Sequence, residues 1–204
     1  MGSFSAPGDQ FGDSVYTYVK EVGSGTFGTA FLCKDDKEQL VVVKRFKSDG
    51  SDGLNDDSLH ELQAAVEVAA GIMSHSHVCK FIKLVKDPGD GKKFSKGLAM
   101  VFEHCPLGSL DKFITERRAQ AQPLTERELL RCASQLAAGL FALHEAGIIH
   151  RDIAIRNIFL ADSSDEHNPL LLKIGDFGQA KYIGKLKTST PIGNGPDRAP
   201  EINA

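Results

Sequence analysis

Apolar and polar residues alternate through the first half of the chain. Val15, Thr17 and Val19 recur at every second position, which is the period of a half-buried strand. The same alternation predicts further strands over residues 29–34, 39–46, 80–86 and 98–103.

Helical spacing marks two other segments. Residues 58–74 place Leu62, Val66 and Ala69 at three- and four-residue intervals. A longer helix is predicted over 125–146, because Thr125 and Glu128 form a capping-box sequence at its start. Gly147 supplies the stop signal. The expected apolar face of this helix consists of Leu129, Cys132, Leu136, Leu140 and Leu143.

Strands therefore dominate the first half of the chain and helices the second. This order predicts an α+β protein of two lobes. Residues 1–12 are rich in Gly, Ser and Pro and are expected to form a mobile tail. The strand-rich lobe is predicted to span 13–103 and the helical lobe 104–204.

Composition excludes several classes of protein. The 204 residues carry a formal charge of −3, which gives no basis for wrapping nucleic acid. The longest apolar run, residues 136–143, is too short to span a membrane. The cysteines lack the spacing of a zinc or redox site and are too sparse for a disulfide scaffold, which predicts a reducing, cytoplasmic location. These cysteines are Cys33, Cys79, Cys105 and Cys132.

A glycine-rich run offers the first candidate chemistry. Gly23, Gly25 and Gly28 form a GxGxxG pattern, and glycine lets a backbone approach a phosphate closely. A dinucleotide-binding domain would place a helix directly after the third glycine. The segment 29–34 reads as a strand instead, so we expect a glycine loop between two strands.

Four further motifs follow in order. They are Lys44 at the end of a valine run, HRDIAIRN at 150–157, DFG at 176–178 and APE at 199–201. A lone lysine at a strand end is usually solvated. Together, however, the five motifs resemble the eukaryotic protein kinase family over residues 15–201, with a tyrosine-kinase-like catalytic loop. The resemblance implies the bilobal kinase fold, with 13–103 as the N-lobe and 104–204 as the hinge and an incomplete C-lobe.

The resemblance also implies ATP and Mg²⁺ as cofactors and a protein as substrate. Asp152 would accept or orient the proton of the substrate hydroxyl, with Arg156 beside it. Lys44 would bind the α- and β-phosphates. Asn157 and Asp176 would hold the magnesium, which prefers carboxylate and amide oxygens.

In the family, the lysine takes an acidic partner from the helix after its strand. Glu67 is the candidate here, although counting back from the turn at 75–78 gives Val66, one residue away. Glu61 is the fallback, and a solvated helix charge is the structural alternative for Glu67. His75 and His77 lack a third ligand, which favours a turn over a metal site.

The expected adenine pocket combines strand and hinge residues. Backbone groups of Glu103 and Cys105 would bind the adenine edge, behind a bulky Phe102, while Ser109 or Asp111 would reach the ribose. Family members usually have Val at position 30 and Ala at position 42, whereas this chain has Ala30 and Val42. We interpret this as a roughly volume-conserving exchange, which requires both side chains to share one face of the sheet. Phe159 would cover the other face of the adenine.

Substrate class stays open at this stage. Ala154 and Arg156 match the tyrosine-kinase pattern, but the segment 193–198 fits neither tyrosine nor serine/threonine kinases. Arg151 suggests control by phosphorylation in the activation loop, because a phosphate there would pair with its guanidinium. The candidate phosphorylation sites are Thr188, Ser189 and Thr190.

The chain stops shortly after the APE motif, whereas the family continues with further helices. The 125–146 helix is therefore expected to need a partner chain over its apolar face. Two hypotheses follow. The first is an ATP-dependent protein kinase, favoured by the intact motif residues. The second is a non-catalytic module that binds nucleotide or a partner.

Overall fold

The computed structural model describes residues 10–11, 16–25, 28–47, 66, 75–87, 97–163 and 170–182. Two compact units divide the chain. The first consists of Met1–Gln63 and Phe81–His104, and the second of Ala64–Lys80 and Cys105–Ala204. The boundary at 104/105 lies one residue from the one predicted between the lobes, and the segment 64–80 belongs to the second unit.

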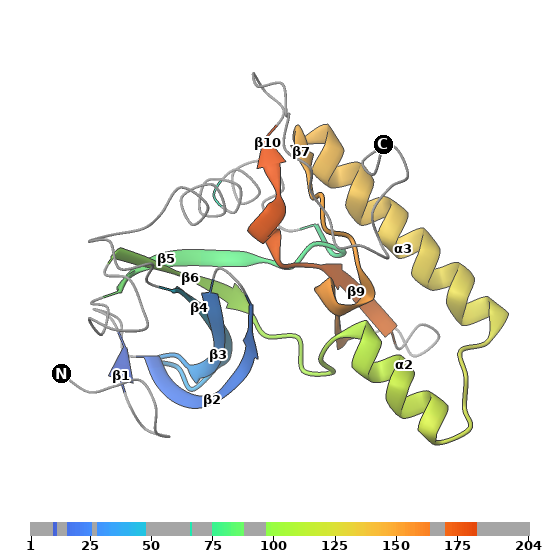
Figure 1. The fold of residues 1–204 in the computed structure, drawn as a ribbon, viewed down its shortest axis with the longest axis horizontal. Coiled ribbons are helices and arrows are strands. Elements are labelled where there is room, and N and C mark those ends of the chain that lie inside the picture. Colours follow the sequence, from blue (N-terminus) through green and yellow to red (C-terminus); the bar gives the residue numbers. More distant parts are fainter. Residues whose placement is uncertain are drawn as a thin grey trace. The chain divides into compact units, whose positions relative to one another are not determined.

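The first unit contains a six-stranded antiparallel sheet with the strand order β1-β2-β3-β4-β6-β5 (Figure 1). Five strands match the predicted ones. The sixth, β1, lies inside the segment predicted to be an N-terminal tail and pairs with β2. The strands are β1 (Gln10–Phe11), β2 (Tyr16–Ser24), β3 (Gly28–Lys34), β4 (Leu40–Phe46), β5 (Phe81–Asp87) and β6 (Gly97–Glu103).

Alternation along β3 and β4 separates two faces of this sheet. Phe31, Cys33, Val41 and Val43 point into one hydrophobic core, in which Cys33 and Val43 are fully buried. Burial raises the pKa of the Cys33 thiol to about 12, so this cysteine is a core residue without reactive thiolate.

The second unit is built around two helices and short strand pairs. β8 pairs with β9, and β10 pairs with β7, both antiparallel. The elements are α2 (Leu110–Ala119), α3 (Glu126–Glu145), β7 (Ile148–Ile149), η1 (Ile155–Asn157), β8 (Ile158–Asp162), β9 (Leu170–Ile174), η2 (Phe177–Gln179) and β10 (Lys181–Tyr182). Of the helix predicted over 58–74, the structure describes Val66 alone, which is helical.

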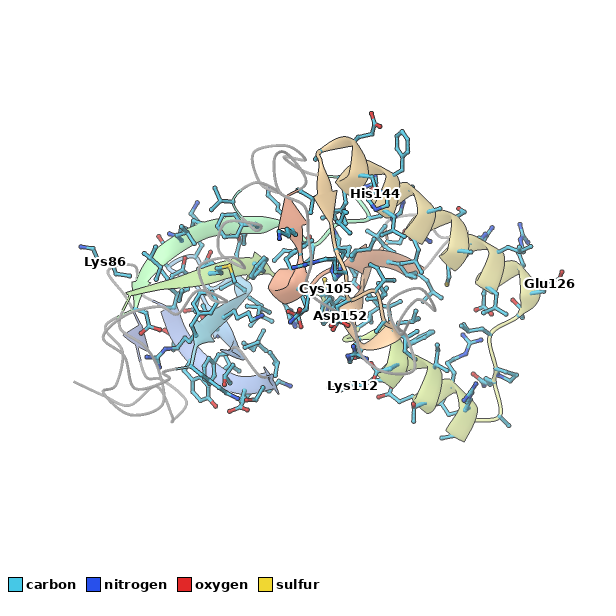
Figure 2. All side chains as sticks on the ribbon, turned by 45° about the horizontal axis from the view of Figure 1, so that its top comes forward. Lys86, Cys105, Lys112, Glu126, His144 and Asp152 are labelled. Atoms are coloured by element: carbon cyan, nitrogen blue, oxygen red, sulfur yellow. The ribbon has the colours of Figure 1, made fainter. Side chains whose placement is uncertain are left out.

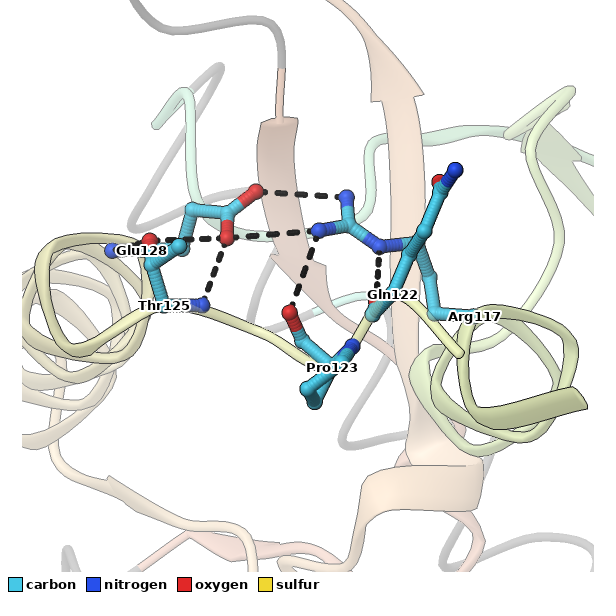
Figure 3. A network of polar contacts seen from close by, with 5 residues as sticks. All are labelled: Arg117, Gln122, Pro123, Thr125 and Glu128. Carbon is cyan, nitrogen blue, oxygen red and sulfur yellow. Dashed lines mark hydrogen bonds and ion pairs between the residues drawn. The ribbon is translucent and has the colours of Figure 1, made fainter. Parts of the chain in front are cut away.

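The predicted capping box opens α3. The Thr125 hydroxyl accepts a hydrogen bond from the Glu128 amide at 3.2 Å, and the Glu128 carboxylate accepts one from the Thr125 amide at 2.7 Å. Arg117 of α2 donates to both carboxylate oxygens of Glu128 and to the carbonyls of Gln122 and Pro123 (Figure 3). The cap thus joins the end of α2 to the start of α3.

One side of α3 packs against β9, and its two ends are marked by Glu126 and His144 (Figure 2). Buried Gln135 donates to the Leu170 carbonyl at 2.9 Å and accepts from the Leu172 amide at 2.8 Å, so one side chain continues the hydrogen bonding of β9. Among the expected apolar-face residues, Cys132 and Leu143 are buried, whereas Leu129 is 53% exposed. Within the described ranges, none of the helices combines the length and apolarity needed to cross a membrane.

Candidate active site

The glycine loop joins β2 to β3, as predicted. The Gly25 amide donates to the Gly28 carbonyl at 2.9 Å, and the Ser24 and Thr29 hydroxyls lie 3.1 Å apart across the base of the loop. A methyl group on Gly28 would lie 2.5 Å from the Arg45 carbonyl oxygen, whereas one on Gly23 or Gly25 would meet no atom within 4 Å. Gly28 is therefore needed for close packing on β4, and the other two glycines leave the loop surface open.

Lys44 lies beside this loop within the first unit. Its Cα pairs with Ala30 of β3, and its Cε lies 3.5 Å from the position of a Gly28 Cβ. The register also pairs Leu32 with Val42. Because every second residue faces the same way, Ala30, Val42 and Lys44 share one face of the sheet, and the same-face arrangement required by the Ala30/Val42 exchange is confirmed.

The predicted hinge residues lie at the end of the sheet and just beyond it. Glu103 ends β6 opposite Val41, and both Glu103 and Phe102 are half-buried. The Phe102 ring packs edge-on against Phe81 at a centroid distance of 5.7 Å. Cys105 belongs to the second unit, where its carbonyl accepts from the Gly108 amide at 3.1 Å.

The second unit brings three predicted residues of the catalytic loop together. Asp152 lies in the loop after β7 (Figure 2). One oxygen of its carboxylate accepts from Arg156 Nη2 and the other from Asn157 Nδ2, each at 2.9 Å. Asn157 Nδ2 also donates to the Asp152 carbonyl at 2.9 Å. The single turn of η1 makes this possible, because it returns residues 156 and 157 to the side chain of residue 152.

His150 connects this loop to the DFG segment. Its Nδ1 accepts from the Asp152 amide at 3.3 Å, so the proton of the neutral ring sits on Nε2, which donates to the Gly175 carbonyl at 3.0 Å. The ring is 1% exposed and packs on Phe177 at a centroid distance of 5.4 Å. Burial lowers the pKa of His150, which favours this neutral form.

Asp176 occupies the turn between β9 and η2. Its φ of 58° lies in the left-handed region, which is uncommon for a residue with a Cβ, and its side chain is exposed. The following Phe177 is buried, and its position turns Asp176 away from the core. Such backbone strain next to a buried anchor is typical of functional turns.

Two further side chains shape this half of the candidate site. A Cβ on Gly175 would lie 2.9 Å from the ring of Phe159, so this ring packs directly on the residue before Asp176. Arg151, also in the left-handed region with a φ of 65°, donates from Nε to the Gln179 carbonyl at 2.6 Å. Burial lowers the pKa of the Arg151 guanidinium.

The donor set of the second unit suits magnesium. Because Asn157 commits its amide nitrogen to Asp152, its amide oxygen is the end left for a cation, and Asp176 presents an exposed carboxylate. Among the described residues, no group of three or more His, Cys, Asp or Glu could hold a metal by itself. Proteins bind Mg²⁺ through one or two carboxylates together with substrate phosphates, and the Asn157 amide and the Asp176 carboxylate offer oxygen donors of this kind.

Some predicted residues lie outside the described part of the chain. These are Glu67 and its fallback Glu61, the candidate phosphorylation sites Thr188, Ser189 and Thr190, the segment 193–198 and the APE motif. The partner of Lys44 therefore stays a prediction. So does the meeting of the phosphate residues of the first unit with the metal residues of the second.

Residues 16–203 match the family model described as protein kinase domain. This match covers nearly the whole chain, and it decides the family. The chain belongs to the protein kinase family.

Similarity to curated proteins agrees with the kinase assignment. The chain is 32% identical to the BDNF/NT-3 growth factors receptor of Gallus gallus over 179 residues, which cover 80% of the chain and 20% of the receptor. It is 30% identical over 180 residues to the high affinity nerve growth factor receptor of Mus musculus, with the same coverage. It is also 30% identical over 186 residues to the serine/threonine-protein kinase Nek11 of Mus musculus, with 89% of the chain and 27% of the kinase covered. The chain thus spans about a fifth to a quarter of the length of these relatives.

Sequence reasoning missed two features of this kinase. It gave His150 no role, although its position two residues before Asp152 was a signal. It also missed the pairing of Arg45 with Asp87, which are 42 residues apart and form a bidentate ion pair at 2.8 and 2.9 Å. The sequence signal was a charged residue, Arg45, inside the strand predicted over residues 39–46.

Proposed function

We propose that the chain transfers the γ-phosphate of ATP to a hydroxyl group of a protein substrate. The observation that carries this proposal is the Asp152 carboxylate, which Arg156 and Asn157 hold from both sides. Membership of the protein kinase family supports it independently.

Asp152 is the proton acceptor in this reaction. The substrate oxygen attacks the γ-phosphorus, its proton passes to Asp152, and the bond from that phosphorus to the β–γ bridging oxygen breaks to release ADP. The hydrogen bonds from Arg156 and Asn157 fix the direction of this carboxylate. Positioning of this kind is the main contribution that a protein makes to phosphoryl transfer.

Asn157 and Asp176 are proposed to hold Mg²⁺, which would neutralise charge on the phosphates. Lys44 is proposed to bind the α- and β-phosphates, and the loop containing Gly23, Gly25 and Gly28 to cover them. Ala30, Val42 and Phe159 would contact the adenine faces, and the backbones of Glu103 and Cys105 its edge. Glu67 is the proposed acidic partner of Lys44.

The test is phosphate transfer from radiolabelled ATP to two peptide pools, one with tyrosine and one with serine and threonine as acceptors. Asp152→Asn should lower the transfer rate about 10²- to 10⁴-fold, the usual contribution of a positioned acid or base. Asp162→Asn is the matched control, because Asp162 is exposed at the end of β8. Equal transfer by the Asp152 variant and the unaltered chain would refute the proposal.

The two pools also decide the substrate class. The catalytic loop favours tyrosine, whereas the relatives include a protein named as a serine/threonine kinase. Phosphate in one pool alone would assign the specificity.

A partner over the second unit and a cytoplasmic location are also proposed. The partner is supported by exposed apolar side chains on α3, namely Leu129, Leu130 and Phe141. The location is supported by the cysteines, which are all free and buried.

A further inference from the structure

The C-terminal end of β4 makes a second contact with the glycine loop. Lys47, three residues after Lys44, donates a hydrogen bond from Nζ to the Gly25 carbonyl. Lys47 and Gly25 are 22 residues apart in sequence. This contact lies wholly within the first unit.

The glycine loop needs such a contact at its N-terminal end, around Gly23 and Gly25. At the far end, Gly28 is fixed by close packing on the Arg45 carbonyl. Around Gly23 and Gly25, by contrast, a Cβ would meet no atom within 4 Å, so packing does not restrain that part. Among the described residues, its polar contacts include the hydrogen bond from the Gly25 amide to the Gly28 carbonyl, the Ser24–Thr29 hydroxyl pair and the hydrogen bond from the Lys47 ammonium.

Strand β4, which ends one residue before Lys47, is held in place by a buried ion pair. Arg45 is 3% exposed and pairs through Nε and Nη2 with both carboxylate oxygens of Asp87, which is fully buried. A bidentate, buried pair has little freedom. The backbone at residues 45–47 is therefore a fixed base from which the lysine reaches the loop.

We propose that Lys47 is a positioning residue that holds the glycine loop ready for a nucleotide. The inference rests on the proposed function and assigns Lys47 a role in ordering the Gly25 end of the loop. Loss of this group would leave the Gly25 turn free to fluctuate, and ordering it would then cost binding energy.

The test uses two readouts on the whole chain. Hydrogen exchange of the peptide covering residues 23–29 is measured without nucleotide, and the dissociation constant of ADP is measured by titration. Lys47→Met, which keeps the aliphatic stem, should accelerate the exchange and weaken ADP binding about three- to tenfold, as befits one partly exposed charged hydrogen bond. Lys47→Arg should restore both values to within about twofold.

Lys34→Met is the matched control. Lys34 lies at the other end of β3, where it pairs with Glu38 at 2.7 Å on the surface. This variant should change neither the exchange of 23–29 nor ADP binding. The role of Lys47 would be overturned if Lys47→Met left the hydrogen exchange of residues 23–29 unchanged, whether or not ADP binding became weaker. It would also be overturned if Lys47→Arg failed to restore the exchange and the ADP affinity. Absence of ADP binding by the unaltered chain would instead count against the proposed function, and the exchange result would still decide whether Lys47 holds the loop.

Discussion

At the level of single residues, the imidazole of His150 stabilises two segments of the second unit. Its two nitrogens bond the Asp152 amide and the Gly175 carbonyl, and its ring packs on Phe177. One neutral side chain thereby couples the loop of the proposed proton acceptor, Asp152, to the segment of the proposed metal ligand, Asp176. Protonation would remove the acceptor at Nδ1 and bury a charge.

This arrangement predicts acid sensitivity of the fold. Because the pKa of His150 is lowered in the folded chain, the unfolded chain binds a proton more readily below about pH 6.5. His150 therefore reduces the free energy of unfolding as the pH falls below that value, by at most about 1.4 kcal/mol per pH unit. The free energy of unfolding is measured with denaturant at pH 7.5 and 5.5. Between these two pH values, it should fall less in His150→Phe than in the unaltered chain. An equal loss in both proteins would contradict this role.

Individual residues differ in how far the sequence predicts them. The family resemblance assigned roles to Asp152, Arg156 and Asn157, and the structure joins the three by hydrogen bonds. Gly139 carried no such signal, yet its Cβ would lie 2.7 Å from the His77 carbonyl oxygen. A contact between a helix and a turn 62 positions away depends on tertiary packing, which residue spacing does not reveal.

At the level of elements, a buried ion pair links two strands of the first unit's sheet. Arg45 of β4 and Asp87 of β5 are separated by β6 in the strand order. Their pairing joins the strand of Lys44 to the edge of the sheet. Removal of Asp87 would take the bidentate partner away from a buried guanidinium, which is costly in the interior.

Asp87→Leu should therefore lower the free energy of unfolding of the first unit by about 3–5 kcal/mol. Adding Arg45→Met should recover most of this loss, because two apolar side chains leave no buried charge. Guanidinium unfolding followed by circular dichroism compares the two variants. A double variant that is no more stable than Asp87→Leu would show that the buried charge is not the cause.

Strands and the long helix were predictable because each has a local signal. β3, β4 and α3 begin and end within one residue of the predicted limits, guided by alternation and by the capping box. β1 has two residues and no periodicity, so only its pairing with β2 defines it. The burial of α3 also differed, because the expected stripe omitted Gln135, a polar residue buried through its bonds to β9.

At the level of the whole molecule, the two units carry different residues of the proposed phosphoryl-transfer chemistry. The first holds the glycine loop and Lys44, and the second holds Asp152, Asn157 and Asp176. A kinase needs all of them around one nucleotide. Each unit presents its own part, and we propose that the two parts act together on one bound nucleotide.

Magnesium-dependent binding of ATP tests this claim most directly. We measure the dissociation constant with and without Mg²⁺ for the unaltered chain, Lys44→Met and Asp176→Asn. Mg²⁺ should lower the dissociation constant of ATP for the unaltered chain. In Asp176→Asn, Mg²⁺ should no longer lower it. Lys44→Met should bind more weakly in both conditions but keep the gain, since its charge acts on phosphate and not on the metal. Two results would refute joint action of the two units. One is an Asp176→Asn protein whose ATP affinity rises with Mg²⁺ as much as that of the unaltered chain. The other is a Lys44→Met protein that binds ATP as tightly as the unaltered chain.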